Sequence, residues 1–341
     1  MSNELYERFL NLIEKDRSKY IKDFIINWEF IDKTRRRGRK SDEVDASDFF
    51  QYGGVQDLIT WFNWLRLVQP CYFGDEYLQD LLPTSLATDQ AVFRKLGLEY
   101  DFSIYHQNIG SDNVLDFKMP FLYPSPKRYQ IKRVLDFGAG YGRQANLWSN
   151  PAHDFTYIAM DAIPKSYCLQ NAYFTALDRP FVDYLDSPDT FKLDLNSKGI
   201  SHIPTWRFDL VPDHSLDLVI CIQVLPELST KLVTHVTNEF FRVLKPGGML
   251  YIRDCKEKWV PAGKVNKERL LTSIGFVKEF EAHIMHGVDL HGIPRIWRKP
   301  DPEVMTAQTR THEEISRQRL NDLDAMTGGL LSKVKQTLKK Q

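Results

Sequence analysis

The chain has 341 residues, 43% of them hydrophobic and 26% charged, which is the composition of an ordinary soluble globular protein. Its 45 basic side chains balance 45 acidic ones, so no net charge draws the molecule toward nucleic acid or an anionic membrane. No run of residues approaches the roughly 18 apolar positions that a membrane span needs.

Amphipathic helices are predicted for the first third of the chain. Apolar residues recur at helical spacing over Glu4–Phe30 and again over Asp57–Leu67. The aromatic residues of the second stretch could form a substrate platform, although core packing or a dimer interface is the more common role of such a pattern. Residues 33–40 are rich in Lys and Arg and could bind phosphates, but such runs are more often solvated loops.

The pattern becomes irregular between Asp101 and Arg128, where Pro120, Pro124 and Pro126 interrupt a series of aromatic residues. We therefore place a domain boundary here. It separates a helical N-terminal domain over residues 1–126, used for substrate binding or oligomerisation, from the rest of the chain.

From Arg133 onward, short apolar runs alternate with helical segments, which indicates a parallel α/β sheet with helical crossovers. Five strands are expected first, then a sixth, and a seventh over Ile293–Arg298. After Pro300 the chain becomes polar and basic, and we predict a helical tail over residues 301–341. The first five strands are predicted at Val134–Phe137, Thr156–Met160, Ile200–Trp206, Leu216–Ile222 and Met249–Ile252.

A glycine-rich turn follows the first of these strands. Gly138, Gly140 and Gly142 give the spacing G-x-G-x-G, with Asp136 two positions before the first glycine. Glycines let the backbone turn tightly and approach a ligand, while the following helix presents its amide donors. A dinucleotide-binding fold would show G-x-G-x-x-G instead.

This segment resembles motif I of the class I S-adenosylmethionine-dependent methyltransferases. In that family the acidic residue and the loop backbone hold the methionine portion of S-adenosylmethionine. The resemblance assigns Asp136 and the three glycines to this task, and we add the adjoining Arg143. It also implies that residues 127–300 form a Rossmann-like seven-stranded methyltransferase sheet.

The second apolar run ends in Asp161, 25 residues after Asp136. A carboxylate at the tip of this strand can accept charge-assisted hydrogen bonds from both ribose hydroxyls, each worth roughly 1.5–3 kcal/mol. The alternative is a helix cap, because Pro164 comes shortly after it. We assign Asp161 and the next residue, Ala162, to the cofactor.

The tips of the next two strands supply further candidates. Trp206 ends the third strand and could stack on the adenine or simply pack. Gln223 lies at the end of the fourth strand, where ligands bind in open α/β sheets, and Pro226 and Glu227 follow it. The Lys245–Gly248 turn also resembles the one before the fifth strand of many of these methyltransferases.

Catalytic candidates lie beyond the fifth and sixth strands. Asp254 leaves the fifth strand, and the loop after the sixth carries His286, Asp289 and His291. If the sixth strand is parallel to the others, this loop returns to the cofactor edge, where a neutral imidazole could take the proton of a hydroxyl acceptor. The same side chains could bind a divalent metal, although we assign no metal site.

The methyl acceptor is narrowed by exclusion and resemblance. Residues 223–227 lack the Asn/Asp-Pro-Pro-aromatic tetrad of DNA and protein-amide methyltransferases of this fold. Residues 161–174, 204–206 and 223–228 resemble sugar O-methyltransferases of bacterial surface-polysaccharide clusters. We therefore expect O-methylation of a sugar or similar small polar acceptor. A small-molecule N- or O-methyltransferase of natural-product biosynthesis and a non-catalytic scaffold stay open, and a nicotinamide-dependent reductase is disfavoured.

The expected setting is a reducing cytoplasm. The first eight residues carry acids where a signal peptide would carry a basic and then an apolar region. Cys71, Cys168, Cys221 and Cys255 lie far apart, which argues against a zinc site or a disulfide framework. We expect a small-molecule partner, no nucleic acid, and a homo-oligomer formed through the N-terminal helices.

Overall fold

The computed structural model describes residues 2–17, 19, 52–66, 80–107, 109–122, 130–228, 230–254, 266–281 and 292–303. Residues 1–299 form one compact unit, and residues 300–341 form a second. The basic run at residues 33–40 lies outside the described residues, as does the predicted tail from residue 304 onward. Within the described part of the chain, no helix has the length and apolar character to cross a membrane.

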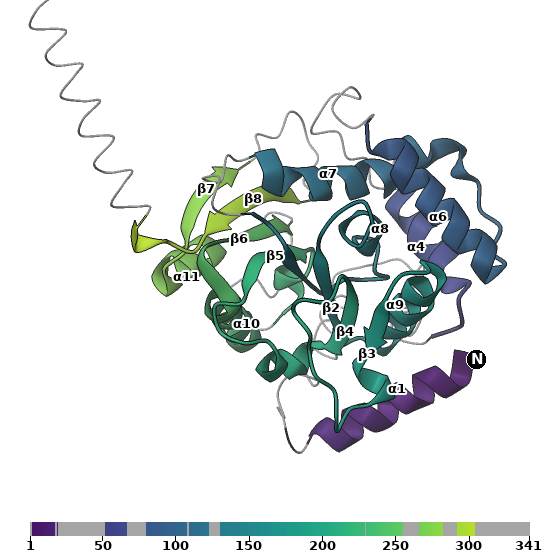
Figure 1. The fold of residues 1–341 in the computed structure, drawn as a ribbon, viewed down its shortest axis with the longest axis horizontal. Helices are drawn as coiled ribbons and strands as arrows, with labels where there is room; N and C mark the ends of the chain where they lie inside the picture. Colours follow the sequence, from purple (N-terminus) through teal and green to yellow (C-terminus); the bar gives the residue numbers. More distant parts are fainter. Residues whose placement is uncertain are drawn as a thin grey trace, which may run out of the picture. The chain divides into compact units, whose positions relative to one another are not determined.

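A single mostly parallel sheet forms the centre of the first unit, with strand order β3-β4-β2-β1-β5-β6-β8-β7 (Figure 1). Its first six strands in chain order are all parallel, whereas β8 is antiparallel to both of its neighbours. Because β7 is antiparallel to β8, it runs in the same direction as β6. The bounds are β1 Arg133–Phe137, β2 Thr156–Asp161, β3 Phe181–Asp183, β4 Gly199–Pro204, β5 Leu216–Ile222, β6 Leu244–Asp254, β7 Val277–Glu281 and β8 Ile293–Arg298.

The Rossmann-like α/β prediction is confirmed, but the residues that the structure describes form a sheet of eight strands rather than the seven expected. The additional strand is β3, which has three residues and pairs only with β4 at the edge of the sheet. A strand this short carries no visible period-two pattern, so sequence analysis missed it. The third predicted strand ends at Pro204, and Trp206 lies in the 3-10 helix η3 (Thr205–Leu210).

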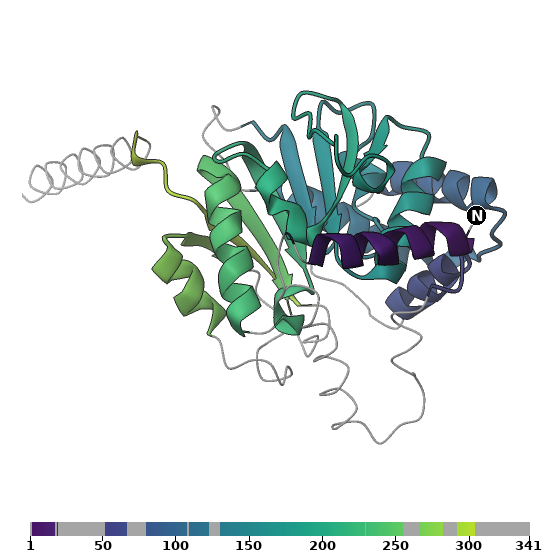
Figure 2. The same cartoon turned by 90° about the horizontal axis from the view of Figure 1, so that it is seen from below.

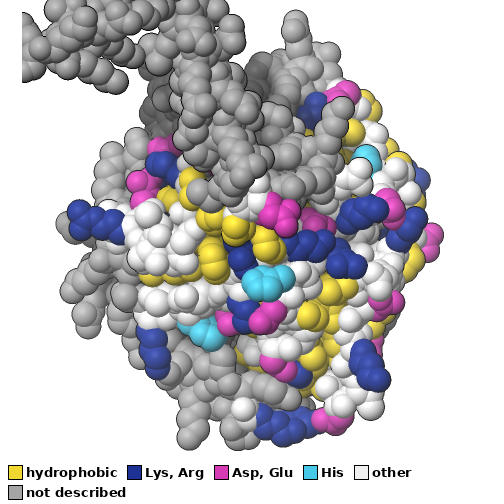
Figure 3. All heavy atoms as spheres, turned by 60° about the vertical axis from the view of Figure 1, so that its left-hand side comes forward, with side chains coloured by type: hydrophobic (Ala, Val, Ile, Leu, Met, Phe, Trp, Pro, Cys, Tyr) yellow, Lys and Arg dark blue, Asp and Glu magenta, His cyan; other side chains and the backbone are white. Residues whose placement is uncertain are grey.

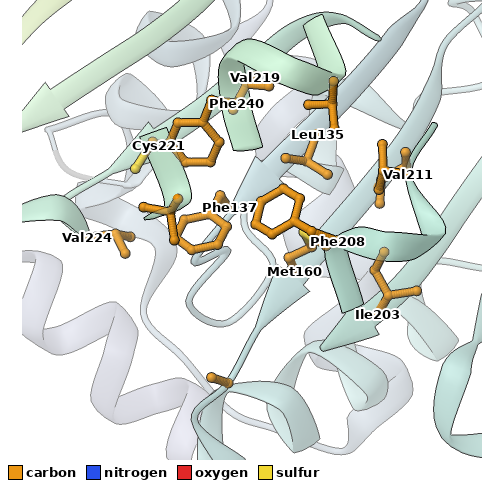
Figure 4. Packing of buried hydrophobic residues seen from close by; sticks show 14 of the residues in the cluster. Leu135, Phe137, Met160, Ile203, Phe208, Val211, Val219, Cys221, Val224 and Phe240 are labelled. Carbon is orange, nitrogen blue, oxygen red and sulfur yellow. The ribbon is translucent and has the colours of Figure 1, made fainter. Parts of the chain in front are cut away.

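Helices cover both faces of the sheet (Figures 1 and 2). One face packs against α4 (Asp57–Arg66), α6 (Leu82–Leu96), α7 (Ile109–Leu122), α8 (Ala145–Trp148) and α9 (Pro164–Ala176). The other face packs against α1 (Ser2–Arg17), α10 (Thr230–Val243) and α11 (Lys267–Ile274). Figure 4 shows the core on the face that α1, α10 and α11 cover, where the Phe137 ring of β1 packs against those of Phe208 and Phe240, with ring centroids 5.6 and 5.1 Å away.

The segment predicted to be irregular contains a buried helix. Residues 102–107 form the 3-10 helix η1, and α7 follows it with Pro120 in its last turn. Asp112, Asn113 and Asp116 of α7 are all nearly inaccessible to solvent, as are most of its apolar residues. Because polar and apolar residues of α7 are buried alike, the helix lacks the amphipathic pattern by which sequence analysis recognises helices.

The N-terminal helices share a hydrophobic core with the sheet. A buried polar group strengthens this attachment: the Asp89 carboxylate of α6 accepts hydrogen bonds from the hydroxyls of Tyr105 and of Tyr173 in α9. Burial raises the pKa of Asp89 to about 6, against the effect of both hydroxyls. The helices before β1 are therefore built into the same compact unit as the sheet.

Candidate functional site

The glycine turn lies at the point where the strand order reverses. β1 pairs with β2 on one side and with β5 on the other, and ligands of open α/β sheets bind outside the carboxyl ends of strands at such a point. Gly138, Gly140 and Gly142 all have positive φ, at 72°, 63° and 91°. The turn is fastened to the end of β2, because the amide of Gly138 donates to the Met160 carbonyl at 2.8 Å.

Asp161 joins the glycine turn to the loop that begins α9. Its Oδ1 accepts from the amides of Ala162 and Ile163 at 2.8 and 2.9 Å. Its Oδ2 accepts from the Gly140 amide at 3.2 Å and from Gln170 Nε2 at 3.0 Å. Desolvation raises the pKa of this buried carboxyl to about 7, although these donors oppose the shift. The contacts to Ala162 and Ile163 resemble a helix cap, and ribose binding stays a prediction.

Asp136 is buried at the end of β1. Its Oδ2 accepts a hydrogen bond of 2.6 Å from the Tyr157 hydroxyl of β2. Burial raises the pKa of Asp136 to about 7, while Tyr157 and the positive charge of Arg143 act in the opposite direction. Two carboxyl groups with raised pKa values, Asp136 and Asp161, therefore flank the glycine turn.

Arg143 belongs to a buried group of charges that we call the α7 charge cluster: Asp112, Asp116, Arg143, Tyr251 and Arg253. Asp116 accepts hydrogen bonds from the Arg143 guanidinium, from Arg253 at 2.8 Å and from the Tyr251 hydroxyl at 2.6 Å. Arg253 also lies 3.3 Å from Asp112. Arg143 thus has a protein partner, and its predicted contact with the cofactor stays a prediction.

Gln223 and Asp254 lie at the carboxyl ends of the neighbouring strands β5 and β6. Gln223 is half-buried, has a φ of 61°, and donates its backbone amide to the Arg253 carbonyl at 2.9 Å. Asp254 is fully buried, with Oδ2 2.8 Å from Lys267 Nζ. Its Oδ1 has no hydrogen-bond partner among the described residues. Burial raises the pKa of Asp254, while Lys267 lowers it.

Trp206 is buried in the core on the face of the sheet that α1 covers, with 3% of its surface exposed. Its Nε1 donates to Asp16 of α1 at 3.0 Å, and its ring lies 5.7 Å from that of Phe9. This placement favours the packing alternative over stacking on adenine. His286, Asp289 and His291 lie outside the described residues. β7, which precedes them in the sequence, runs parallel to β6, as the prediction required.

Residues from elsewhere in the chain approach the glycine turn; sequence analysis missed Gln170 and the Asp57–Lys165 pair, and offered the aromatic residues of Asp57–Leu67, which include Trp61, only as a possible substrate platform. Gln170 of α9 donates from Nε2 to the Gly140 carbonyl at 2.6 Å as well as to Asp161. From α4, Trp61 lies near Gly140, and Asp57 pairs with Lys165 at the start of α9. Besides that aromatic stretch, the sequence offered one signal: Gln170 follows Asp161 by nine residues, close enough for the helix after the strand to reach back to it.

Opposite charges are interspersed on the face of the molecule shown in Figure 3. The described salt bridges fit this picture, since exposed pairs such as Lys198 with Asp154 neutralise each other locally. No large surface of one sign appears among the side chains coloured in that view.

Gly138 leads to a prediction about stability. A Cβ built on Gly138 would clash with Cγ2 of Val224, whereas one on Gly140 would meet nothing closer than 3.9 Å. Left-handed backbone costs an L-residue about 1–2 kcal/mol at either position. We expect Gly138→Ala to lose about 1–3 kcal/mol more than Gly140→Ala in thermal or urea unfolding, because it also overpacks.

Val224→Ala tests the cause of this difference. It should restore part of the stability of Gly138→Ala by making room for the new methyl group. Equal losses for Gly138→Ala and Gly140→Ala would show that Val224 does not constrain the turn.

Comparisons with known proteins match the segment that contains this site. A family model described as a methyltransferase domain matches residues 135–252, from β1 to β6. The O-methyltransferase 3 of Dictyostelium discoideum is 46% identical over 52 residues, which are 15% of this chain and 11% of that protein. A tRNA N(3)-cytidine methyltransferase of Danio rerio is 35% identical over 68 residues, which are 20% of this chain and 19% of that protein.

The matches to curated relatives thus span less than a fifth of the relatives' own length. Among solved structures, the CurJ carbon methyltransferase is 14% identical with a TM-score of 0.39, covering 72% of this chain and 70% of that one. The arsenic(III) S-adenosylmethionine methyltransferase of Chlamydomonas reinhardtii is 21% identical with a TM-score of 0.35, covering 52% and 67%. Sequence identities and TM-scores this low support no inference about function.

Proposed function

The chain belongs to the class I S-adenosylmethionine-dependent methyltransferases, and from this premise we propose that it methylates a hydroxyl of a sugar or similar small polar acceptor. The observation that supports an oxygen acceptor is Asp254. Its carboxylate lies at the carboxyl end of β6, and one of its oxygens has no hydrogen-bond partner among the described residues.

The residues of the glycine turn fit S-adenosylmethionine. A ligand can approach the backbone of Gly140, because no other atom lies closer than 3.9 Å to the position that a Cβ would take there. The Asp161 carboxylate lies 3.2 Å from its amide, at the adjoining strand tip. We propose that Asp136 and the three glycines hold the methionine portion, and that Asp161 exchanges the Gln170 hydrogen bond for ribose hydroxyls. Ala162 and Gln223 would line the same edge.

The bound cofactor supplies an electrophilic methyl group for in-line displacement. The protein's main contribution is to hold the acceptor oxygen in line with that methyl group, which can supply roughly 7–11 kcal/mol. A base that takes the hydroxyl proton adds roughly 10²–10⁴-fold. We assign the proton to Oδ1 of Asp254, whose ionised form Lys267 favours against the effect of burial. We keep His286, Asp289 and His291, which lie outside the described residues, as proposed contributors.

A nitrogen acceptor in a small molecule is the second candidate. The relative from Dictyostelium discoideum is named an O-methyltransferase, whereas the relative from Danio rerio is named for a cytidine nitrogen. A neutral amine would need no strong base, so a buried carboxylate at this edge favours the hydroxyl. A non-catalytic scaffold is disfavoured because Gly138, Gly140, Gly142 and Asp161 keep their places in the turn.

Calorimetric titration of the purified protein with S-adenosylmethionine tests the premise, and Asp161→Ala tests the site. We expect wild type to bind and the variant to bind about tenfold more weakly or worse, since charge-assisted hydrogen bonds to the ribose are lost. Asp154→Ala, an exposed carboxylate paired with Lys198, is the control and should bind normally. Identical titrations for wild type and Asp161→Ala would remove Asp161 from the site.

The acceptor is tested by incubating wild type and cofactor with sugars, other polyols and amines, and measuring the gain of one methyl group by mass spectrometry. Methylated sugar hydroxyls would support the proposal. Methylation of amines alone would replace it with the second candidate.

A further inference from the structure

Helix α4 lies against the glycine turn although it precedes β1 by more than 60 residues. A Cβ built on Gly140 would lie 3.9 Å from both Cη2 and Cζ3 of Trp61, so the outer edge of the indole ring faces the turn. The Trp61 ring is also 6.2 Å from the ring of Tyr141, the next residue of the turn. Trp61 therefore stands beside the one glycine of the turn whose missing side chain would meet no close contact.

A second contact of α4 reaches the other side of the same site. Asp57, one helical turn before Trp61, lies 3.1 Å from Nζ of Lys165, and both side chains are largely shielded from solvent. Lys165 is in the first turn of α9, four residues after Asp161. Residues four apart lie on one side of a helix, so this side of α4 contacts both loops that flank the cofactor site.

The position of α4 is fixed by the hydrophobic core. Leu58 and Phe62 are fully buried, and the Phe62 ring lies 4.5 Å from Phe93 and 5.3 Å from Tyr141. These two residues are also four apart and form a second side of the helix. The core thus holds α4 in place while Asp57 and Trp61 face the two loops.

We propose that α4 is a wall of the cofactor site: the Trp61 indole packs on S-adenosylmethionine beside Gly140, and the Asp57–Lys165 ion pair positions the helix. The inference rests on the proposed cofactor site. The indole side chain offers a large apolar area, and both its edge and its face can make favourable contacts with an aromatic ligand such as the adenosine portion of the cofactor. Trp61 would touch the ligand, whereas Asp57 and Lys165 would act through the placement of α4.

The test is calorimetric titration with S-adenosylhomocysteine, which binds without turnover. We expect Trp61→Ala to raise the Kd about tenfold or more and Trp61→Phe to raise it less, because Phe keeps part of the aromatic face. Asp57→Asn should raise the Kd several-fold. Its effect should shrink in the Asp57→Asn/Trp61→Ala double variant, since the ion pair acts through Trp61.

Phe121→Ala is the matched control. Phe121 is an aromatic residue of α7 with 48% of its surface exposed, on an element not assigned to the cofactor, and its loss should leave the Kd unchanged. Hydrogen exchange of the wild type gives a second readout: the amides of residues 57–66 should become more protected when S-adenosylhomocysteine is added.

The possible failures are distinguishable. If wild type binds but Trp61→Ala binds within twofold of it, and the α4 amides gain no protection, α4 is not part of the site and the inference is overturned. If wild type does not bind at all, the proposed function fails instead. Should Trp61→Ala not fold, as thermal unfolding would reveal, Trp61→Phe and the hydrogen-exchange measurement decide the question.

Discussion

Asp254→Asn is expected to lower the rate of methyl transfer to a hydroxyl by roughly 10²–10⁴-fold while leaving cofactor binding intact. The amide preserves the volume of the side chain but cannot accept a proton. Asp254 is suited to the role because Lys267, 2.8 Å away, holds one oxygen and leaves the other without a partner among the described residues. Single-turnover rates and calorimetric titration of the same variant separate chemistry from binding.

The pH dependence of the wild-type rate provides a further check on Asp254. Burial raises its pKa above the ordinary aspartate value, and a base must be deprotonated to act, so activity should fall as the pH drops through that raised pKa. Lys267 lowers this pKa, so Lys267→Met should move the acidic limb of the profile to higher pH. Full activity of Asp254→Asn, or an acidic limb that does not move in Lys267→Met, would show that another group takes the proton, with His286, Asp289 and His291 as the next candidates.

Asp116→Asn is expected to destabilise the protein by about 3–5 kcal/mol, because it leaves two buried guanidinium groups without their carboxylate. Asp116 is fully buried and accepts hydrogen bonds from Arg143, Arg253 and Tyr251. Burial opposes its ionisation, but Arg253 and Arg143 prevail and hold the pKa of Asp116 below its usual value. Its stabilising contribution is therefore present at neutral pH and lost as the pH falls through that lowered pKa.

Urea unfolding of two control variants gives stability losses with which the loss of Asp116→Asn can be compared. Tyr251→Phe removes one hydrogen bond to Asp116 and should cost about 0.5–1.5 kcal/mol. Asp189→Asn removes an exposed partner of Lys15, with 71% of the Asp189 side chain accessible, and should leave the midpoint of urea unfolding nearly unchanged because solvent screens this pair. If Asp116→Asn cost no more than Tyr251→Phe, the α7 charge cluster would not fasten α7 to the sheet.

The α7 charge cluster also affects the cofactor site indirectly. Arg143 leads from the glycine turn into α8, and its charge lowers the pKa of Asp136. Arg253 precedes Asp254 on β6. A loosened cluster should therefore disturb both strand tips, and Asp116→Asn that still folds should bind cofactor more weakly than wild type.

The sequence by itself predicted the parallel sheet, most of its strands and the glycine turn. These features are local, because the mostly apolar strand β1 is followed by the turn with Gly138, Gly140 and Gly142, and glycine adopts the positive φ of these positions without strain. Residues 135–252, which the methyltransferase family model matches, are also the part whose strand tips could be located from periodicity.

Features that depend on distant contacts were decided only by the tertiary structure. Asp116 and Arg253 are 137 positions apart, and no local pattern indicates that they share a buried hydrogen bond. The sequence did not reveal that Arg143, whose predicted cofactor contact stays a prediction, pairs with Asp116, or that Trp206 lies against α1 through Asp16, 190 positions away. Helix α7 was missed because its polar residues are buried by partners that the sequence does not reveal.

At the carboxyl ends of the strands, where we propose that the cofactor binds, local sequence and tertiary structure likewise determined different features. Local sequence determined which residues form the turn and the strand tips, because backbone conformation and hydrophobic period depend on near neighbours. The tertiary structure decided what stands against them: Gln170 on Asp161, Val224 on Gly138, and Trp61 beside Gly140. Packing in the folded core sets these contacts, since each joins side chains or turns of different elements that meet only in the folded chain.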